Sequence, residues 1–175
     1  MTQIAHTFSA LLLGGCLFMG CSDSTESNAD AKDDSANSSP NATYLLTEKP
    51  ADAWGVGAAR EKVKDQGEVT LIGRIGGSAD PFVGSLAAFT IVDPKVEHCS
   101  ADEGCPTPWD YCCTQDQVKD NIATIKFVGE DGQPVGQSAK QLLGVKELDT
   151  VVVQGQAKRD DNGNLTVLAR KVYVE

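Results

Sequence analysis

Four cysteines and one histidine are concentrated in a short segment in the second half of the chain. They are His98, Cys99, Cys105, Cys112 and Cys113. Thiolates and imidazoles are ligands for soft and borderline metal ions such as zinc and copper(I), and pairs of thiols form disulfides. No Ser-His-Asp arrangement, phosphate-binding loop or dinucleotide fingerprint accompanies them in the sequence. We therefore predict no catalytic residues, and these five side chains are the candidates for chemistry.

The spacing of the cysteines leaves three interpretations open. Two disulfides are favoured, because thiols outside the cytoplasm are oxidised, and four cysteines in one loop can then form two pairs. Each disulfide would raise the free energy of unfolding by about 2–4 kcal/mol. Cys99 and Cys105 would pair separately with Cys112 and Cys113, or with each other beside a strained Cys112–Cys113 bond.

The alternative is a zinc or copper site that uses the four thiolates and His98, the only histidine outside the expected signal peptide. Against it, the usual zinc pair of cysteines two to four residues apart is missing. Adjacent cysteines on an extended chain also point in different directions. The third interpretation is a redox pair at Cys112 and Cys113, although residues 96–118 contain no Lys or Arg to lower a thiol pKa.

Trp109 and Tyr111 stand between the cysteines, after two prolines in residues 106–111. The prolines preset an extended backbone, on which alternate side chains share one side. The two rings either form a surface for a small ligand or partner, or build a small core for the loop. We favour the core.

Two further cysteines lie at the end of an apolar run, residues 8–20, which is too short to remain as a membrane-spanning helix and is typical of an export signal. The run ends in Leu13-Gly14-Gly15-Cys16-Leu17-Phe18-Met19-Gly20-Cys21. This resembles the lipobox of bacterial lipoproteins, in which a small residue precedes the cysteine that carries the lipid. Cys16 has the better local match, but cleavage at Cys21 leaves an even number of cysteines and a polar mature start. We expect lipidation at Cys21, with Cys16 as the alternative and a plain secretory signal as the third interpretation.

The resemblance implies a protein of the bacterial cell envelope, anchored outside the cytoplasm by its lipid. After a signal peptide at residues 1–20, we expect a low-complexity tether at 21–47. Its polar residues cannot bury enough apolar surface to offset the entropy of ordering. A short helical segment is expected at 48–66, with its helix from about Val56 to Asp65 and a stop at Gly67.

From Glu68 onward, apolar and β-branched runs alternate with turn residues. The predicted strands are 69–75, 86–92, 122–128, 150–157 and 165–174, with a short helix at 138–143 and a hairpin turn at 160–163. This order resembles the OB-fold, a five-stranded Greek-key barrel with a helix between strands three and four. The predicted fold class is all-β with one short helix in a barrel at 67–175, preceded by a signal peptide, a disordered tether and a short helix.

The cysteines fall in a predicted insertion at 94–120, between the second and third strands of this barrel. In OB-folds these strands carry the binding face, so the resemblance implies that the insertion borders a ligand site. The chain has 25 acidic and 15 basic residues and a formal charge of −10, which disfavours binding to a phosphate backbone. We predict a non-enzymatic, lipid-anchored binding or assembly module for an unknown protein or small ligand, with no nucleic-acid partner. It would need no cofactor, whereas the alternative function is zinc or copper binding.

Overall fold

The computed structural model describes residues 42–100, 102 and 104–175. The expected signal peptide, both lipidation candidates (Cys21 and Cys16) and most of the tether lie outside the described residues. The helices and strands are β1 (Trp54–Gly55), α1 (Val56–Lys62), β2 (Glu68–Ile75), β3 (Ala88–Val92), the 3-10 helix η2 (Pro108–Asp110), α2 (Gln115–Val118), β4 (Ile122–Phe127), α3 (Ala139–Leu143), β5 (Thr150–Arg159) and β6 (Leu165–Val174). Among the described residues, no helix has the length and apolarity needed to cross a membrane.

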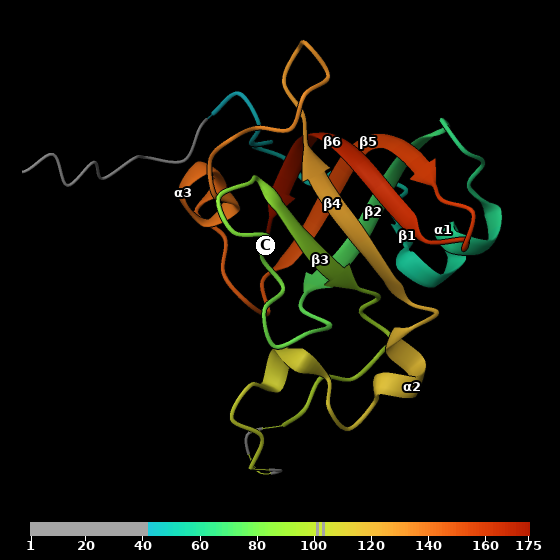
Figure 1. Ribbon diagram of the computed structural model, residues 1–175, viewed down its shortest axis with the longest axis vertical. Coiled ribbons are helices and arrows are strands. Elements are labelled where there is room, and N and C mark those ends of the chain that lie inside the picture. Colours follow the sequence, from blue (N-terminus) through green and yellow to red (C-terminus); the bar gives the residue numbers. More distant parts are fainter. Residues whose placement is uncertain (1–41, 101, 103) are drawn as a thin grey trace, which may run out of the picture. The chain divides into compact units, whose positions relative to one another are not determined.

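Five strands close into a barrel (Figure 1). β2 pairs with β3, β3 with β4, β4 with β6, β6 with β5, and β5 returns to β2. Only the β4–β6 pairing in this circuit is parallel. With α3 between the third and fourth barrel strands, this is the topology of an OB-fold-like barrel, so the predicted mostly-β barrel is confirmed.

The barrel interior is filled by the inward side of each strand. Side chains alternate along a strand with a period of two, and β2 shows this pattern with buried residues at every second position. The rings of Phe89 and Phe127 are fully buried and pack with their centroids 6.2 Å apart. Alternation in the sequence was therefore a sound guide to these strands.

The segment before β1 is part of the folded domain. The N–H of Leu46 donates to the carbonyl of Val172 at 2.7 Å, and the N–H of Val172 donates to the carbonyl of Tyr44 at 2.8 Å. The Tyr44 ring packs edge-on against Phe127 with centroids 5.6 Å apart. The structure thus places residues 44–46 on the barrel, in a stretch that the sequence analysis had assigned to the tether.

α1 is held at both ends by charged side chains from distant parts of the chain. At its start, the buried carboxylate of Asp93 accepts the N–H of Gly57 at 2.9 Å. At its end, the Arg159 guanidinium donates to the carbonyls of Arg60 and Val63 at 2.6 and 3.0 Å. These bonds attach the helix to the end of β3 and to the β5–β6 hairpin.

Candidate metal centre

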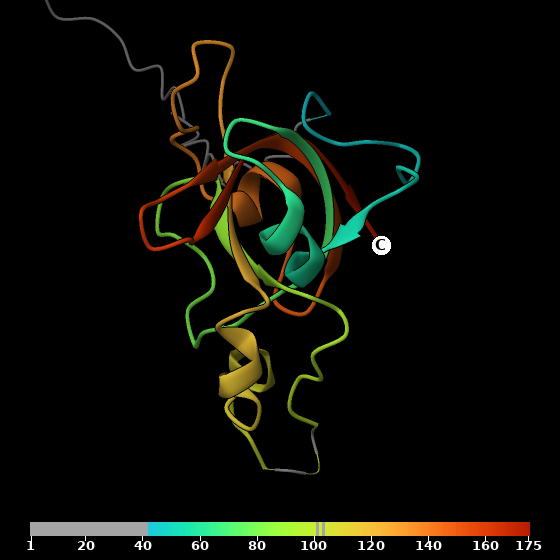
Figure 2. The same cartoon turned by 90° about the vertical axis from the view of Figure 1, so that its right-hand side faces the viewer.

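The insertion between β3 and β4 has a small core of its own, and it extends from one end of the barrel (Figure 1, Figure 2). Its buried residues are Val92, Val96, Tyr111 and Val118, with Ile122 packed against them. Tyr111 has no exposed surface, so it is a core residue of the insertion and not part of an exposed aromatic surface. Burial raises the pKa of Tyr111, and the nearby Arg74 guanidinium opposes this effect.

The four cysteine sulfur atoms converge on one point, and all lie within 4.8 Å of one another. The Sγ of Cys112 is 3.0 Å from that of Cys105 and 3.2 Å from that of Cys99. The Sγ of Cys113 is 3.5 Å from that of Cys99 and 3.8 Å from the other two. Sulfurs in a tetrahedral zinc site, with bonds of about 2.3 Å, are about 3.8 Å apart. The four cysteines therefore lie close enough to hold a metal ion.

The favoured disulfide interpretation is not the arrangement seen in the structure. A disulfide requires sulfurs about 2.05 Å apart, and the shortest separation is the 3.0 Å between Cys105 and Cys112. All four cysteines are free thiols.

The argument that adjacent cysteines diverge assumed an extended chain, and this assumption was wrong. The N–H of Thr114 donates to the carbonyl of Tyr111 at 2.9 Å, which closes a turn with Cys112 and Cys113 at its centre. Tyr111 enters this turn in the left-handed conformation, with φ of 58°. The turn allows both thiols to face the same point.

Backbone and carboxylate contacts hold the four cysteines in place. The N–H of Cys113 hydrogen bonds to the sulfur of Cys99, which is only 2% exposed. The Asp110 carboxylate accepts the Thr107 hydroxyl at 2.7 Å and the N–H of Cys112 at 2.8 Å. These two bonds lower the pKa of Asp110, which stays ionised and braces the turn. The sequence analysis did not assign this role to Asp110.

His98 lies beside the cluster and does not join it. Its Nδ1 is 2.8 Å from the carbonyl oxygen of Cys99, and its ring stands edge-on to Tyr111 with centroids 6.4 Å apart. Among the described residues, the group that could hold a metal ion contains only the four cysteines. The predicted ligand set is corrected accordingly, because adjacency in the chain to Cys99 does not direct the imidazole toward the sulfurs.

The four thiols do not share one pKa. The backbone N–H of Cys113 lowers the pKa of Cys99, and hydrogen bonds from neighbouring thiols add to this effect against the opposing influence of burial. Hydrogen bonds with Cys105 and Cys99 raise the pKa of Cys112. The hydrogen bond with Cys99 also raises the pKa of Cys113, to about 11. Cys99 is therefore the preferred site of the first thiolate.

Metal binding at this cluster is expected to strengthen as the pH rises. Binding requires thiolates, and the pKa values of Cys112 and Cys113 lie above neutrality, so a metal ion displaces at least these two protons. The affinity should then rise by about 100-fold for each pH unit near neutrality. Competition with a chromophoric chelator between about pH 6 and about pH 8 measures this slope. A flat profile would contradict a thiolate site.

Trp109 joins the insertion to the barrel. Its indole N–H donates to the carbonyl of Ala79 at 2.9 Å, and its own carbonyl accepts the N–H of Gly77 at 2.8 Å. Trp109 is half-buried, and its polar atoms are thus engaged by the loop between β2 and β3.

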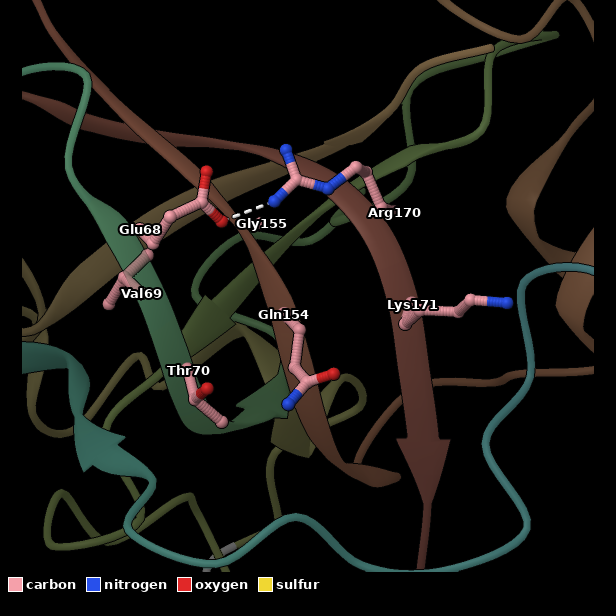
Figure 3. Close-up of a pocket in the computed structure, with 7 residues that line it drawn as sticks. All are labelled: Glu68, Val69, Thr70, Gln154, Gly155, Arg170 and Lys171. Atoms are coloured by element: carbon pink, nitrogen blue, oxygen red, sulfur yellow. Dashed lines mark hydrogen bonds and ion pairs between the residues drawn. The ribbon is translucent and has the colours of Figure 1, made fainter. Parts of the chain in front are cut away.

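An open groove crosses the outer face of β2, β5 and β6 (Figure 3). An ion pair between Glu68 and Arg170 spans it, and the ammonium of Lys171 donates to the carbonyl of Thr43. A second polar groove lies over β3, β4 and β6. Its lining includes Arg60, Thr90, Thr124, Asp160, Asn164 and Thr166. Two of these strands, β3 and β4, are the second and third strands of the barrel, which carry the binding face in OB-folds.

The sequence matches no protein-family model and no curated protein sequence. The structure is similar to the hypothetical protein ygiW from E. coli, with 13% identity and a TM-score of 0.37 over 75% of this chain and 96% of that one. It is similar to the mitochondrial single-stranded DNA binding protein Rim1 from S. cerevisiae, with 15% identity and a TM-score of 0.31 over 63% and 96% of the two chains. For the aspartyl tRNA synthetase from Entamoeba histolytica the identity is 6% and the TM-score 0.43, over 78% of this chain and 25% of that one. Such similarities say nothing about function, and the strand order of the barrel defines its fold.

Proposed function

We propose that this protein is a non-enzymatic binding module that holds one zinc ion through its four-cysteine insertion. The observation that carries the proposal is the convergence of the four sulfurs within 4.8 Å. Four thiolates complete a tetrahedral zinc site and leave no position open for water or substrate, as in structural zinc sites. The ion would therefore stabilise the insertion and would not perform chemistry.

Zinc suits the cluster better than copper. Tetrahedral sets of four sulfurs are typical of zinc or iron. Among the described residues, the hydrophobic cluster of the insertion consists of four buried residues and one partly buried residue, so the insertion benefits from a metal as a further source of folding free energy. The metal analysis described below distinguishes zinc from copper and iron.

Metal analysis and thiol alkylation of the purified protein test the proposal. We expect about one zinc per chain, as in structural four-cysteine sites. Peptide mapping should show Cys99, Cys105, Cys112 and Cys113 protected from alkylation until a chelator is added, without any reductant. A protein that contains no metal and is alkylated only after reduction would contain two disulfides, and the proposal would fall.

We also propose that a lipid on Cys21 anchors the protein in the bacterial cell envelope, outside the cytoplasm. The apolar run at 8–20 and the polar segment behind it support this location. Labelling with a radioactive fatty acid should mark the wild type and the Cys16→Ser variant, and the label should disappear in Cys21→Ser. An unlabelled wild type would rule out the anchor.

The partner in this proposal is a protein or a small ligand and not a nucleic acid. The formal charge of −10 supports this, because binding to a phosphate backbone depends on clustered Lys and Arg. Fluorescence anisotropy with a single-stranded oligonucleotide at about 0.15 M salt should show no binding. Salt-sensitive binding would overturn this part of the proposal.

A further inference from the structure

The loop that follows β2 contacts the insertion just before the Cys112–Cys113 pair. The N–H of Gly77 donates to the Trp109 carbonyl at 2.8 Å, and the Trp109 indole donates to the Ala79 carbonyl at 2.9 Å. Each segment therefore donates one hydrogen bond to the other. The loop and η2 hold each other at two points.

Gly76 is the point of closest approach. A Cβ at this position would lie 2.5 Å from the carbonyl oxygen of Trp109 and 2.9 Å from the Tyr111 ring. The first neighbour is backbone, and the second is a fully buried side chain. Gly76 is itself held by β3, since its N–H donates to the Thr90 carbonyl and its carbonyl accepts the Thr90 hydroxyl, at 3.1 and 2.7 Å. A larger residue would therefore have to push η2 away from the barrel.

A shift of η2 reaches the metal ligands directly. The helix ends at Asp110, whose carboxylate holds the N–H of Cys112. Tyr111 then opens the turn that carries Cys112 and Cys113. The positions of two of the four sulfurs thus depend on the backbone that Gly76 contacts.

We infer that the loop beginning at Gly76 is a positioning element of the metal centre, and that metal binding in turn orders this loop. The inference rests on the proposed zinc site. The two effects are reciprocal by thermodynamic linkage. Because Thr90 is bonded to Gly76 and also lines the polar groove over β3, β4 and β6, the same contacts connect the metal centre to that groove.

A pair of glycine variants tests the first half of the inference. Gly76→Ala should weaken zinc affinity by about 10- to 100-fold, the range seen when outer-shell support of a metal ligand is lost. Gly136→Ala is the matched control, because no atom lies within 4 Å of its new Cβ. It should change the affinity by less than about twofold. Competition titration with a chelator measures both.

Amide hydrogen exchange of the wild type tests the second half, and it does not depend on the folding of a variant. Removal of the metal should speed exchange at Gly77 by at least about tenfold, since the bond to Trp109 opens locally. Exchange at Ala157, whose N–H donates to the Gly67 carbonyl within the barrel, should not change. A wild type without zinc would overturn both proposals. A zinc-bound wild type with unchanged Gly77 exchange, or an equally tight Gly76→Ala variant, would overturn this inference alone.

Discussion

Replacing Cys99 by serine is expected to abolish stoichiometric zinc binding and to loosen the insertion while the barrel stays folded. Cys99 is the buried ligand, and the N–H of Cys113 favours its thiolate. A serine hydroxyl remains protonated and is not a structural zinc ligand. The zinc affinity should fall by more than about 100-fold, which exceeds the loss caused by outer-shell changes. Metal analysis after gel filtration and a chelator titration measure this loss.

Val118→Ala is the control for the Cys99→Ser variant. Val118 belongs to the same small core and has only 3% of its surface exposed, but it is not a ligand. Its truncation should lower the free energy of unfolding by about 2 kcal/mol and should leave about one zinc per chain. If Cys99→Ser retained full zinc, or if Val118→Ala lost as much zinc as Cys99→Ser, the four-thiolate site would be wrong.

A second large effect is expected in the barrel wall, where Gly155→Ala should destabilise the protein by about 3 kcal/mol. A Cβ at Gly155 would lie 2.3 Å from the Leu168 carbonyl oxygen and 2.8 Å from the Ala169 Cα. Both atoms are backbone of β6, so they cannot rotate away. The pairing of β5 with β6 shifts register between Gln154 and Gly155, where the strand bends to close the barrel. Urea unfolding followed by circular dichroism measures the change.

Gly136→Ala again provides the comparison, because its Cβ would meet open space. It should change the free energy of unfolding by less than about 1 kcal/mol. An unchanged unfolding midpoint for Gly155→Ala would contradict this prediction. It would show that β5 and β6 can move apart at the register shift without a loss of free energy of unfolding.

The strands were predictable because each carries its own signal. Alternating apolar residues and flanking turn residues mark β2, β4 and β6, and the last strand was predicted with the bounds that the structure shows. η2 and α2 were missed, because helices of three and four residues are too short to show a period. The contacts of Tyr44 and Leu46 with the barrel were also missed, since each joins residues more than 80 positions apart.

The candidate site was found only in part. The clustering of the cysteines identified the candidate ligands, but the convergence of their sulfurs on one point did not follow from their spacing. His98 was assigned by its position in the chain, and the structure turns its ring toward Tyr111. Asp110 carried a usable sequence signal. An Asp side chain often accepts a hydrogen bond from the backbone N–H two residues further along the chain, which forms a local turn, and here that N–H belongs to Cys112. Gly76 carried no such sequence signal, because a glycine that directly follows a strand usually marks only the end of that strand.

Composition and periodicity are local properties of the chain, and they determined the acidic charge, the polar segment and the strands. The barrel topology was predicted from the resemblance of the strand order to the OB-fold. The sequence by itself also placed four cysteines in one insertion. Only the tertiary structure decided that their sulfurs meet, because this depends on the left-handed backbone at Tyr111 and on the turn that Thr114 closes. The loop that contains Gly77 is hydrogen-bonded to Trp109, just before this turn, although no sequence pattern connects the two residues. The convergence of the four sulfurs within 4.8 Å is therefore a property of the folded backbone and not of the spacing of the cysteines.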